Sequence, residues 1–526
     1  MIRDLAGAGA TTADADVLVI GAGTAGLVMA EALARRGHSV LCLESGGMTQ
    51  DEEENPLNVV EQLGSFYGGA AHGRFRCLGG TSTRWGGALI PFAAGDFSDA
   101  LWPVSREEIL RYQPAVEQLF GLAPGPFDFP EVVGEGADHV ARLAKWPAFA
   151  RRNVANLLME RIKGSGGPQI WLNATVTDFA VEGGELRRVT ARAADGATLT
   201  ASARIVILAA GAIESTRILL LIDRQNGGLL TDGTDQLGGY FHDHLSVVVG
   251  RIARPDRKAL NRLTGLRFEE GGMMRNMRFE LADGSPLRAE VPPCFAHIMC
   301  EDVPGSGFDA LRDLFRRLQQ RRLPTPKMLW KLAIASPWLS RAVWWRYVDK
   351  RVLYADDADV QVHMVIEQEP VAGSRIGLST DAVDSYGQPL ATIDWTPSET
   401  DCANLTRAVD AFAVMWSSGP LAKLGSFERR PAGEAEAELA QGSGIYHPGG
   451  TTRMGRDDSS GVVDTDLRPF RLPNMRVVST SVLPTGGGCN PTMMLMMLAH
   501  RCVDEVSATL ARGPNTRIAA HKERPA

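Results

Sequence analysis

The stretch that most constrains this 526-residue chain lies near its start, where an apolar run meets three glycines at the spacing G-x-G-x-x-G. The apolar residues 17–20 suit a strand that is buried on both faces. Gly21 permits a tight turn, Gly23 allows a diphosphate to approach the backbone, and Gly26 allows the next helix to pack against the strand. The pattern predicts a strand–turn–helix unit that binds a dinucleotide.

The sequence after the glycines supports this interpretation over a chance glycine turn. Residues 27–36 are rich in Ala and Leu and predict a helix, which Gly37 ends. Residues 39–44 predict a second strand that ends in Glu44, 18 positions after Gly26. An acidic residue at about this distance accepts a hydrogen bond from a ribose hydroxyl.

Composition bounds the class of protein. Hydrophobic residues make up 44% of the chain, which is enough for a large core and favours two or more domains. The net charge of −7 argues against a nucleic-acid partner. The seven cysteines form no CxxC pair, which is typical of reduced thiols. Because we find no signal-peptide pattern and expect no membrane span, we expect a cytoplasmic protein.

Two further segments predict loops at the edge of a sheet. Residues 79–87 contain four glycines and small hydroxyl residues, which suit a loop that holds a flat polar ligand. Trp85 in this loop is either a wall for that ligand or part of the core. Residues 204–211 predict a buried strand and 212–220 a helix, so this strand also delivers a loop to the sheet edge where ligands of α/β folds bind.

The middle of the chain has a different pattern. Alternating residues in 360–367 predict antiparallel sheet within a substrate domain. The segment 308–354 carries 11 Lys or Arg against three Asp, with four interleaved tryptophans. It could lie on a membrane surface, cover the active site, form a dimer contact, or be a solvated helical face whose aromatic side chains point inward.

The last glycine-rich blocks contain His447, within 446–455, and the pair Asn490-Pro491. Asn490 is a suitable helix cap and Pro491 a suitable first residue for an apolar helix over 493–503. The positive end of this helix would face whatever occupies the preceding loop. From the sequence alone, His447 is either a structural histidine or a catalytic one.

Taken in order, these landmarks resemble the glucose-methanol-choline (GMC) family of FAD-dependent alcohol oxidoreductases, and most of all its cholesterol oxidase-like and pyranose oxidase-like members. The resemblance implies an α/β fold: a Rossmann-like FAD-binding domain with a mostly parallel sheet, and a second α+β substrate domain with an antiparallel sheet. It assigns 14–95, 160–250 and 440–512 to the FAD domain and 96–159 and 251–439 to the substrate domain. We expect 1–13 and 513–526 to be flexible termini.

The resemblance also implies FAD as the cofactor. Pyranose oxidase attaches its flavin through a histidine where Arg84 stands, so we expect non-covalent FAD here. The residues expected to bind it are Gly21, Gly23, Thr24, Ala25, Gly26, Glu44, Ser45, Gly79, Gly80, Thr81, Ser82, Trp85, Gly86, Gly87, Val176, Ala210, Gly211, Pro491 and Thr492.

The same resemblance makes His447 the base that removes the hydroxyl proton of an alcohol and makes Asn490 the group that orients the substrate oxygen. Neutral imidazole suits this task near pH 7. We expect a sugar, glycoside or sugar-derived substrate. The alternatives are a sterol-like or lipid alcohol, and a hydroxynitrile-lyase-type reaction without net redox. The sequence does not separate an oxidase from a dehydrogenase.

Two other groups of titratable residues receive structural interpretations. His242 and His244 share one face of a predicted strand, but no third ligand is spaced to complete a metal site, so we expect none. Glu367 resembles a family position that borders the active site, yet a solvated strand carboxylate is the simpler reading. A peripheral membrane contact or a dimer contact through 308–354 stays open.

Overall fold

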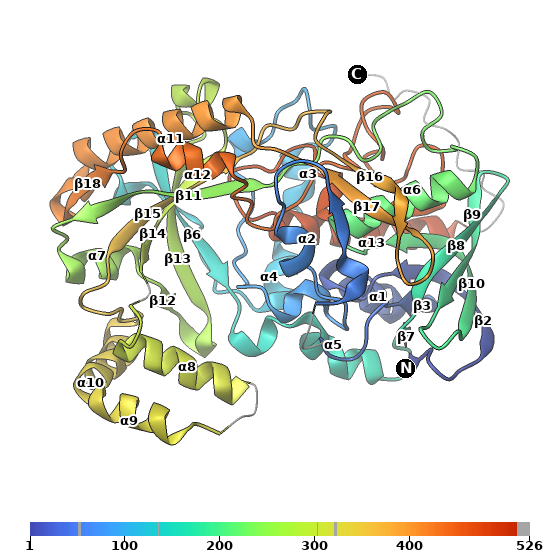
Figure 1. Cartoon of the computed structure of the whole chain (residues 1–526), viewed down its shortest axis with the longest axis horizontal. Helices are drawn as coiled ribbons and strands as arrows, with labels where there is room; N and C mark the ends of the chain where they lie inside the picture. The colour runs from blue at the N-terminus through green and yellow to red at the C-terminus, as the bar shows by residue number, and fades with distance from the viewer. Residues whose placement is uncertain (51–53, 135, 302, 320–322, 513–526) are drawn as a thin grey trace.

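The computed structural model describes residues 1–50, 54–134, 136–301, 303–319 and 323–512. Two large sheets dominate it: a mostly parallel sheet on one side and an antiparallel sheet on the other, with a small helical projection below the second (Figure 1). The mixed α/β architecture predicted from the sequence is confirmed.

The first sheet has the strand order β1-β7-β3-β2-β10-β9-β8, with β19 also paired to β10. The pairs β1–β7, β7–β3, β3–β2, β2–β10 and β10–β19 are parallel, whereas β8, β9 and β10 pair antiparallel. The strands are β1 (Ile2–Asp4), β2 (Ala10–Ile20), β3 (Val40–Leu43), β7 (Gln169–Leu172), β8 (Thr175–Glu182), β9 (Glu185–Arg192), β10 (Thr198–Leu208) and β19 (Met475–Val477).

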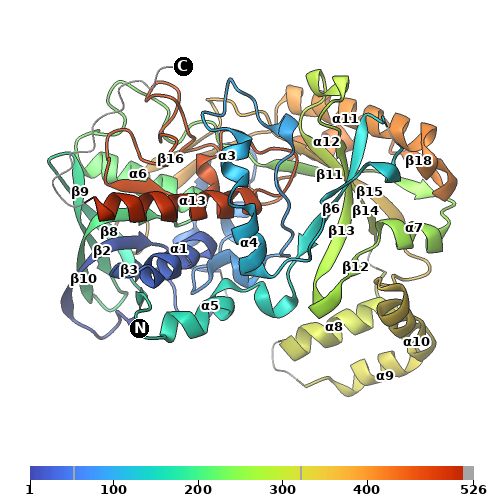
Figure 2. The same ribbon diagram turned by 180° about the vertical axis from the view of Figure 1, so that it is seen from behind.

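Helices cover this sheet and bury the apolar side chains of its strands. The residues 17–20 of β2 are buried, as predicted, and α1 packs on α5 and on the C-terminal helix α13 (Figure 2). The helices of this half and its connections are α1 (Thr24–Arg35), α2 (Gly69–His72), α3 (Arg106–Leu110), α4 (Gln113–Phe120), α5 (Val154–Lys163), α6 (Ala212–Gln225) and α13 (Thr492–Ala511).

The second sheet is antiparallel, with the order β18-β11-β15-β14-β13-β6-β5 and β12 paired to β13. Its strands are β5 (Asp128–Phe129), β6 (His139–Trp146), β11 (His244–Ala253), β12 (Arg267–Phe268), β13 (Met274–Leu281), β14 (Cys294–Cys300), β15 (Val360–Glu367) and β18 (Ser426–Arg429). A long helix, α11 (Glu399–Ser418), packs on β15 and β18, and the shorter helices α7 (Arg257–Thr264) and α12 (Glu434–Ala440) contact β13 and β11. A buried cluster around Phe412 and Trp416 fills this layer.

A third, small sheet joins chain segments that are far apart in sequence. Its strands β4 (Val60–Gln62), β16 (Arg375–Val383) and β17 (Pro389–Asp394) pair in the order β16-β17-β4. The strands β16 and β17 pack on α6 of the first half, although the sequence placed them in the substrate domain. The proposed domain boundary at residue 250 falls within β11, and the division into two domains stays a prediction.

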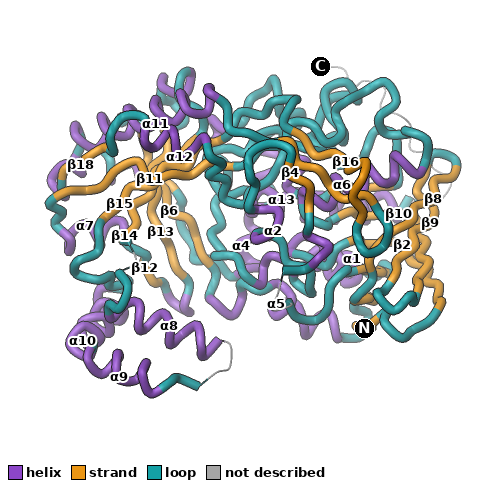
Figure 3. The backbone as a smooth tube through the Cα atoms, in the orientation of Figure 1, coloured by secondary structure: helices purple, strands orange, loops and turns teal. Residues whose placement is uncertain are grey.

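Three helices between β14 and β15 form a projection that we call the arm. They are α8 (Gly307–Gln319), α9 (Pro326–Ile334) and α10 (Ser336–Trp344), followed by a π-helical turn, η8 (Trp345–Asp349). These helices contact one another, and the tube view shows them standing away from the rest of the molecule (Figure 3).

The structure differs from the expectation of a flexible start. Ile2–Asp4 pair with β7 through the backbone, and Leu5 is fully buried, with Ile2 packed against the same core. The other expected tail, 513–526, lies outside the described residues. All seven cysteines are free thiols, as predicted. Across the described residues, no helix is both long enough and apolar enough to traverse a bilayer, and a cytoplasmic location stays a prediction.

Candidate active site

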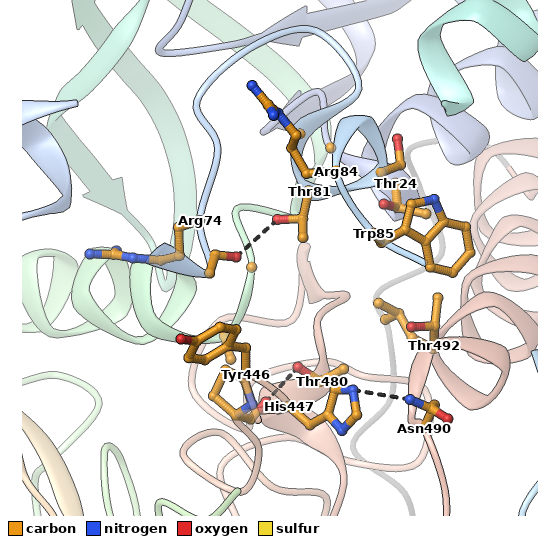
Figure 4. Close-up of a pocket in the computed structure, with 18 of the residues that line it drawn as sticks. Thr24, Arg74, Thr81, Arg84, Trp85, Tyr446, His447, Thr480, Asn490 and Thr492 are labelled. Atoms are coloured by element: carbon orange, nitrogen blue, oxygen red, sulfur yellow. Dashed lines mark hydrogen bonds between the residues drawn. The ribbon is translucent and has the colours of Figure 1, made fainter. Parts of the chain in front are cut away.

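A cavity of 840 Å³ is lined by residues from both large sheets. The parallel strands β2, β3, β10 and β19 all end at the same edge of the first sheet, and the residues that follow them line this cavity. This is where α/β folds collect ligands. Figure 4 shows side chains from both ends of the sequence converging there, with Thr24 and Trp85 across from His447 and Asn490.

The glycine turn has the close packing that its spacing predicts. Gly21 has a positive φ of 101°, and a side chain there would lie 2.6 Å from the Ala209 carbonyl oxygen. A side chain at Gly26 would lie 1.9 Å from the Gly21 carbonyl oxygen, so only glycine allows α1 to approach β2 this closely. The turn therefore leaves backbone, and not side chain, at the cavity wall.

Two helix N-termini at the cavity wall lack side-chain caps. α1 begins after Gly23, and α13 begins after Pro491, with no side-chain hydrogen bond to the first-turn amides in either. Neither helix has an acidic residue in its first turn, and both Thr24 and Thr492 line the cavity. Unpaired amides and the helix dipole make such ends favourable for anionic groups.

Most of the predicted cofactor residues line this cavity. They are Gly21, Gly23, Thr24, Ala25, Glu44, Ser45, Gly80, Thr81, Ser82, Trp85, Gly86, Gly87, Ala210, Gly211 and Thr492. The remaining four, Gly26, Gly79, Val176 and Pro491, are not among the lining residues. Val176 instead pairs with Ala191 in the β8–β9 hairpin. The Glu44 carboxylate accepts the backbone N–H groups of Ala22 and Gly46 at 2.8 and 2.9 Å, so it also secures the glycine turn.

His447 and Asn490 lie side by side at the cavity wall. The Asn490 side-chain nitrogen is 3.2 Å from His447 Nε2, although the two residues are 43 positions apart (Figure 4). The other ring nitrogen of His447, Nδ1, is 3.3 Å from Nδ1 of His244, which in turn places Nε2 2.8 Å from the Gly487 carbonyl oxygen.

This chain of contacts fixes the protonation of both histidines. A carbonyl oxygen only accepts, so His244 must carry its proton on Nε2. The pKa of His244 is lowered to about 4, mainly by burial, so its Nδ1 is an unprotonated acceptor near pH 7. His447 therefore donates from Nδ1, and its Nε2 keeps a lone pair at the cavity.

The surroundings of His447 keep its imidazole neutral. Burial lowers the pKa of His447 well below its usual value, and the neighbouring His244 and the Arg278 guanidinium lower it further. Arg278 Nη2 also donates to the Asn490 side-chain oxygen at 2.9 Å, which turns the amide nitrogen of Asn490 toward His447. Neither Nε nor Nη1 of Arg278 has a hydrogen-bond partner within the part of the chain that the structure describes.

Asp243 holds the loop that carries His447. One carboxylate oxygen accepts the backbone N–H groups of His244 and His447 at 2.6 and 2.7 Å. The other accepts from the Tyr67 hydroxyl at 2.7 Å and the Tyr446 backbone at 2.9 Å. Tyr446 has a positive φ of 69°, which is uncommon for a side chain of this size, so the carboxylate stabilises a strained turn next to the imidazole.

Two sequence interpretations are wrong. Asn490 does not cap α13, since its side chain is engaged with His447 and Arg278, and the helix cap is Pro491. Glu367 is not solvated: it is buried opposite His244 on β15 and accepts the Gly487 backbone N–H at 2.7 Å. Burial raises the pKa of Glu367 to about 8.

Sequence reasoning missed the residues that close the cavity on the antiparallel side. They alternate along neighbouring strands, with Ser246 on β11, Asn276 and Arg278 on β13, Phe295, His297 and Met299 on β14, and His363 and Val365 on β15. The signal was present, because alternate residues of a strand point to one face. It could not be used without knowing which strands pair and which face is turned to the cavity.

The fold brings potential metal ligands together at His244, but this group does not include His242. Asp243, His244 and His447 bring potential ligand atoms within 4.8 Å of one another. These atoms already have hydrogen-bond partners, and the Arg278 cation lowers the pKa of both histidines. The arrangement is therefore satisfied without an ion, and the absence of a metal site stays a prediction.

Comparisons with known proteins agree with this architecture. Residues 370–499 match the family described as GMC oxidoreductase, and 19–64 match an NAD(P)-binding Rossmann-like domain. The chain is 24% identical to 2-methyl-1,2-propanediol dehydrogenase from Mycolicibacterium austroafricanum, over 94% of this chain and 96% of that protein. It is 30% identical to a C-glycoside 3-oxidase from Microbacterium trichothecenolyticum over 145 residues, which are 27% of this chain and 26% of that one. The solved structure of pyridoxine 4-oxidase from Mesorbium loti has the same fold, with a TM-score of 0.57, 16% identity and coverage of 94% and 99% of the two chains.

The Rossmann-like half and the antiparallel half, with the cavity between them, have the architecture of GMC oxidoreductase structures. Residues 370–499 match the GMC oxidoreductase family, and the chain is a flavin-dependent alcohol oxidoreductase that uses FAD.

The residues of the cavity fit FAD. Gly211 has a positive φ of 78° and no heavy atom within 4 Å of where a side chain would begin, which leaves room at the end of β10. The uncapped ends of α1 and α13 offer backbone donors to the diphosphate and to a polar ring edge. The Glu44 carboxylate at the end of β3 lies at the wall where a ribose needs an acceptor.

Proposed function

We propose that this enzyme oxidises a hydroxyl group of a sugar or glycoside to the carbonyl, with His447 as general base and Asn490 orienting the substrate oxygen. The observation that carries this proposal is the hydrogen-bonded chain from Gly487 through His244 to His447. It leaves the Nε2 lone pair of His447 at the cavity wall, 3.2 Å from the Asn490 amide nitrogen.

The two side chains have complementary tasks. The carbinol O–H replaces the Asn490 amide as the donor to His447 Nε2, and the Asn490 amide then donates to the carbinol oxygen. This pair of contacts holds the alcohol in one pose, and Arg278 prevents the Asn490 amide from turning its oxygen toward the substrate. A hydride is lost readily only as the hydroxyl proton leaves, so the base and the amide must act together.

The bound FAD supplies the hydride acceptor. The protein's own contribution at that wall is the uncapped N-terminus of α13, which begins two residues after Asn490. Its amides and dipole stabilise negative charge nearby. No acidic side chain in the first turn of the helix weakens this effect.

The cavity wall supports a polyhydroxylated substrate over a sterol. The antiparallel side presents Ser246, Asn276, His297 and His363, which offer hydrogen bonds at several points around a small ring. A sterol would offer no hydrogen bonds to Ser246, Asn276 and His297, at a penalty of about 1–3 kcal/mol for each polar group left buried without a partner. The resemblance to a C-glycoside 3-oxidase points in the same direction.

A panel of alcohols mixed with the enzyme under anaerobic conditions tests this proposal. We expect glycosides or free sugars to bleach the flavin absorbance, sterols and simple diols to bleach it poorly, and His447→Ala to abolish bleaching. Repeating the assay in air with peroxide detection then separates an oxidase from a dehydrogenase. Turnover of a cyanohydrin without bleaching would support the lyase alternative and overturn the redox function.

A further inference from the structure

The arm presents apolar side chains to solvent that a self-contained helical module would bury. Trp330, Trp344 and Tyr347 are 68%, 61% and 66% exposed, and Leu329 and Ile334 are exposed beside them. The inward-pointing arrangement considered from the sequence is therefore wrong for these residues. Trp338 and Trp345 fit it better, since both are only partly exposed: Trp338 packs beside Phe308 and donates to the Tyr354 carbonyl oxygen at 3.4 Å, and Trp345 packs against Arg262.

The exposed side chains fall on helix faces and not at random. On α9, Trp330 and Ile334 are four residues apart, so they lie on one face of the helix. On α10 and the turn after it, Val343 and Tyr347 repeat this spacing, and Trp344 and Val348 do so beside them. Each helix therefore carries an apolar face that nothing in the described chain covers.

Basic residues flank the exposed face of α9. The segment 308–354 holds 11 Lys or Arg against three Asp, in a chain whose net charge is −7. Lys327 is exposed on α9 next to the Trp330 face, with Lys331 partly exposed one residue beyond it. The charge of the arm is thus opposite to that of the molecule as a whole.

We propose that the arm is a docking surface for an anionic phospholipid membrane. Tryptophan and tyrosine favour the boundary between lipid headgroups and hydrocarbon, and flanking lysine and arginine bind anionic headgroups. Surfaces that bind a partner protein are usually depleted in lysine. The arm carries lysines next to its exposed tryptophan, so it does not fit that pattern. The short helices suit attachment to one side of a bilayer, because none in the described chain can span it.

The position of the arm gives this docking a consequence for the active site. The arm connects β14 to β15, and these paired strands contribute Phe295, His297, Met299, His363 and Val365 to the cavity wall. None of the described arm residues lines the cavity, so the structure does not support the arm as its cover. Docking would instead hold the antiparallel wall of the cavity next to the membrane surface.

Vesicle flotation of the full-length, FAD-loaded enzyme tests the proposal. The vesicles contain phosphatidylcholine alone, or phosphatidylcholine with about a third phosphatidylglycerol. We expect binding to the anionic vesicles only, and weakening by salt. Trp330→Ser with Trp344→Ser, and separately Lys327→Glu with Lys331→Glu, should each lower the ratio of bound to free protein by about tenfold or more.

The matched control is Phe149→Ser with Val414→Ser, which removes two apolar side chains of similar exposure from outside the arm and should leave binding unchanged. Flavin absorbance and melting temperature show whether each variant is folded. Wild-type protein that stays free of anionic vesicles at low salt, or arm variants that bind as well as wild type, would overturn the proposal. So would a dimer in sedimentation that Trp330→Ser with Trp344→Ser dissociates, because the arm would then be a contact between copies.

Discussion

The Asp243 carboxylate accepts the backbone N–H of His447 at 2.7 Å across 204 positions of sequence, and so ties the loop of the proposed base to the start of β11. The same carboxylate holds the strained Tyr446 and the Tyr67 hydroxyl. Four donors meet on one side chain, which makes the position of the imidazole depend on a residue outside the cavity lining. This relationship leads to the first prediction.

Asp243→Asn should lower kcat by about ten- to a hundredfold, because the amide nitrogen meets backbone donors that the carboxylate accepted, at a loss of about 1.5–3 kcal/mol. Flavin content should stay near wild type, since Asp243 does not line the cavity. Steady-state kinetics with flavin absorbance provide the measurement. Full activity in this variant would show that the loop holds His447 without the carboxylate.

His447→Gln should reduce the anaerobic rate of flavin bleaching by about 10²–10⁴-fold, which is the usual contribution of a positioned base. His363→Gln is the matched control, because it changes another cavity-lining histidine that lies outside the Gly487–His244–His447 chain. We expect the control to raise KM more than it lowers kcat. Equal losses of kcat in both variants would contradict the assignment of the base.

Arg278→Met should move the acid limb of the kcat/KM profile to higher pH. The Arg278 cation lowers the pKa of His447, so removing it raises that pKa. The base works only when unprotonated, and activity is then lost at a higher pH as the solution is acidified. Arg278→Lys keeps the positive charge but loses the guanidinium hydrogen bond to Asn490. The acid limb should therefore return to its wild-type position while kcat stays low. If the acid limb of the Arg278→Met profile stays where it is in wild type, Arg278 does not set the pKa of His447.

Glu367→Gln should make stability less dependent on pH. The pKa of Glu367 is raised to about 8 in the folded protein from an ordinary value of 4.5, so the folded state favours the neutral carboxyl. Below pH 4.5 both states are protonated and nothing is lost, whereas stability falls as pH rises from there to about 8. Thermal melts at pH 5 and pH 8.5 should show a smaller drop for Glu367→Gln than for wild type. An equal fall in melting temperature in both proteins would mean that a group other than Glu367 causes the pH dependence.

Acid precipitation should release the flavin into solution, leaving a colourless pellet. Arg84 lies at the cavity wall and donates to the Gln50 side chain at 2.6 Å, and a guanidinium does not form the covalent bond that a histidine can make to a flavin. The absorbance of supernatant and pellet after centrifugation decides the matter. A yellow pellet would mean a covalent link through another residue.

The parts of this protein that the sequence determined are those in which neighbours in the chain act together. The glycine spacing at 21–26, the acid after β3 and the alternation in β15 are local patterns, because turn geometry and strand periodicity operate over a few residues. These patterns, with the family resemblance, were enough to predict the α/β fold and the FAD site, and to propose His447 and Asn490 as a pair.

The tertiary structure decided everything that depends on contacts between distant segments. The register of β11 against β15 places Glu367 opposite His244 and out of solvent, where the sequence suggested an exposed carboxylate. The tautomer of His447, the orientation of Asn490 by Arg278 and the exposure of Trp330 on the arm likewise follow from packing. Burial and long-range hydrogen bonds belong to the folded chain as a whole, so no local pattern encodes them.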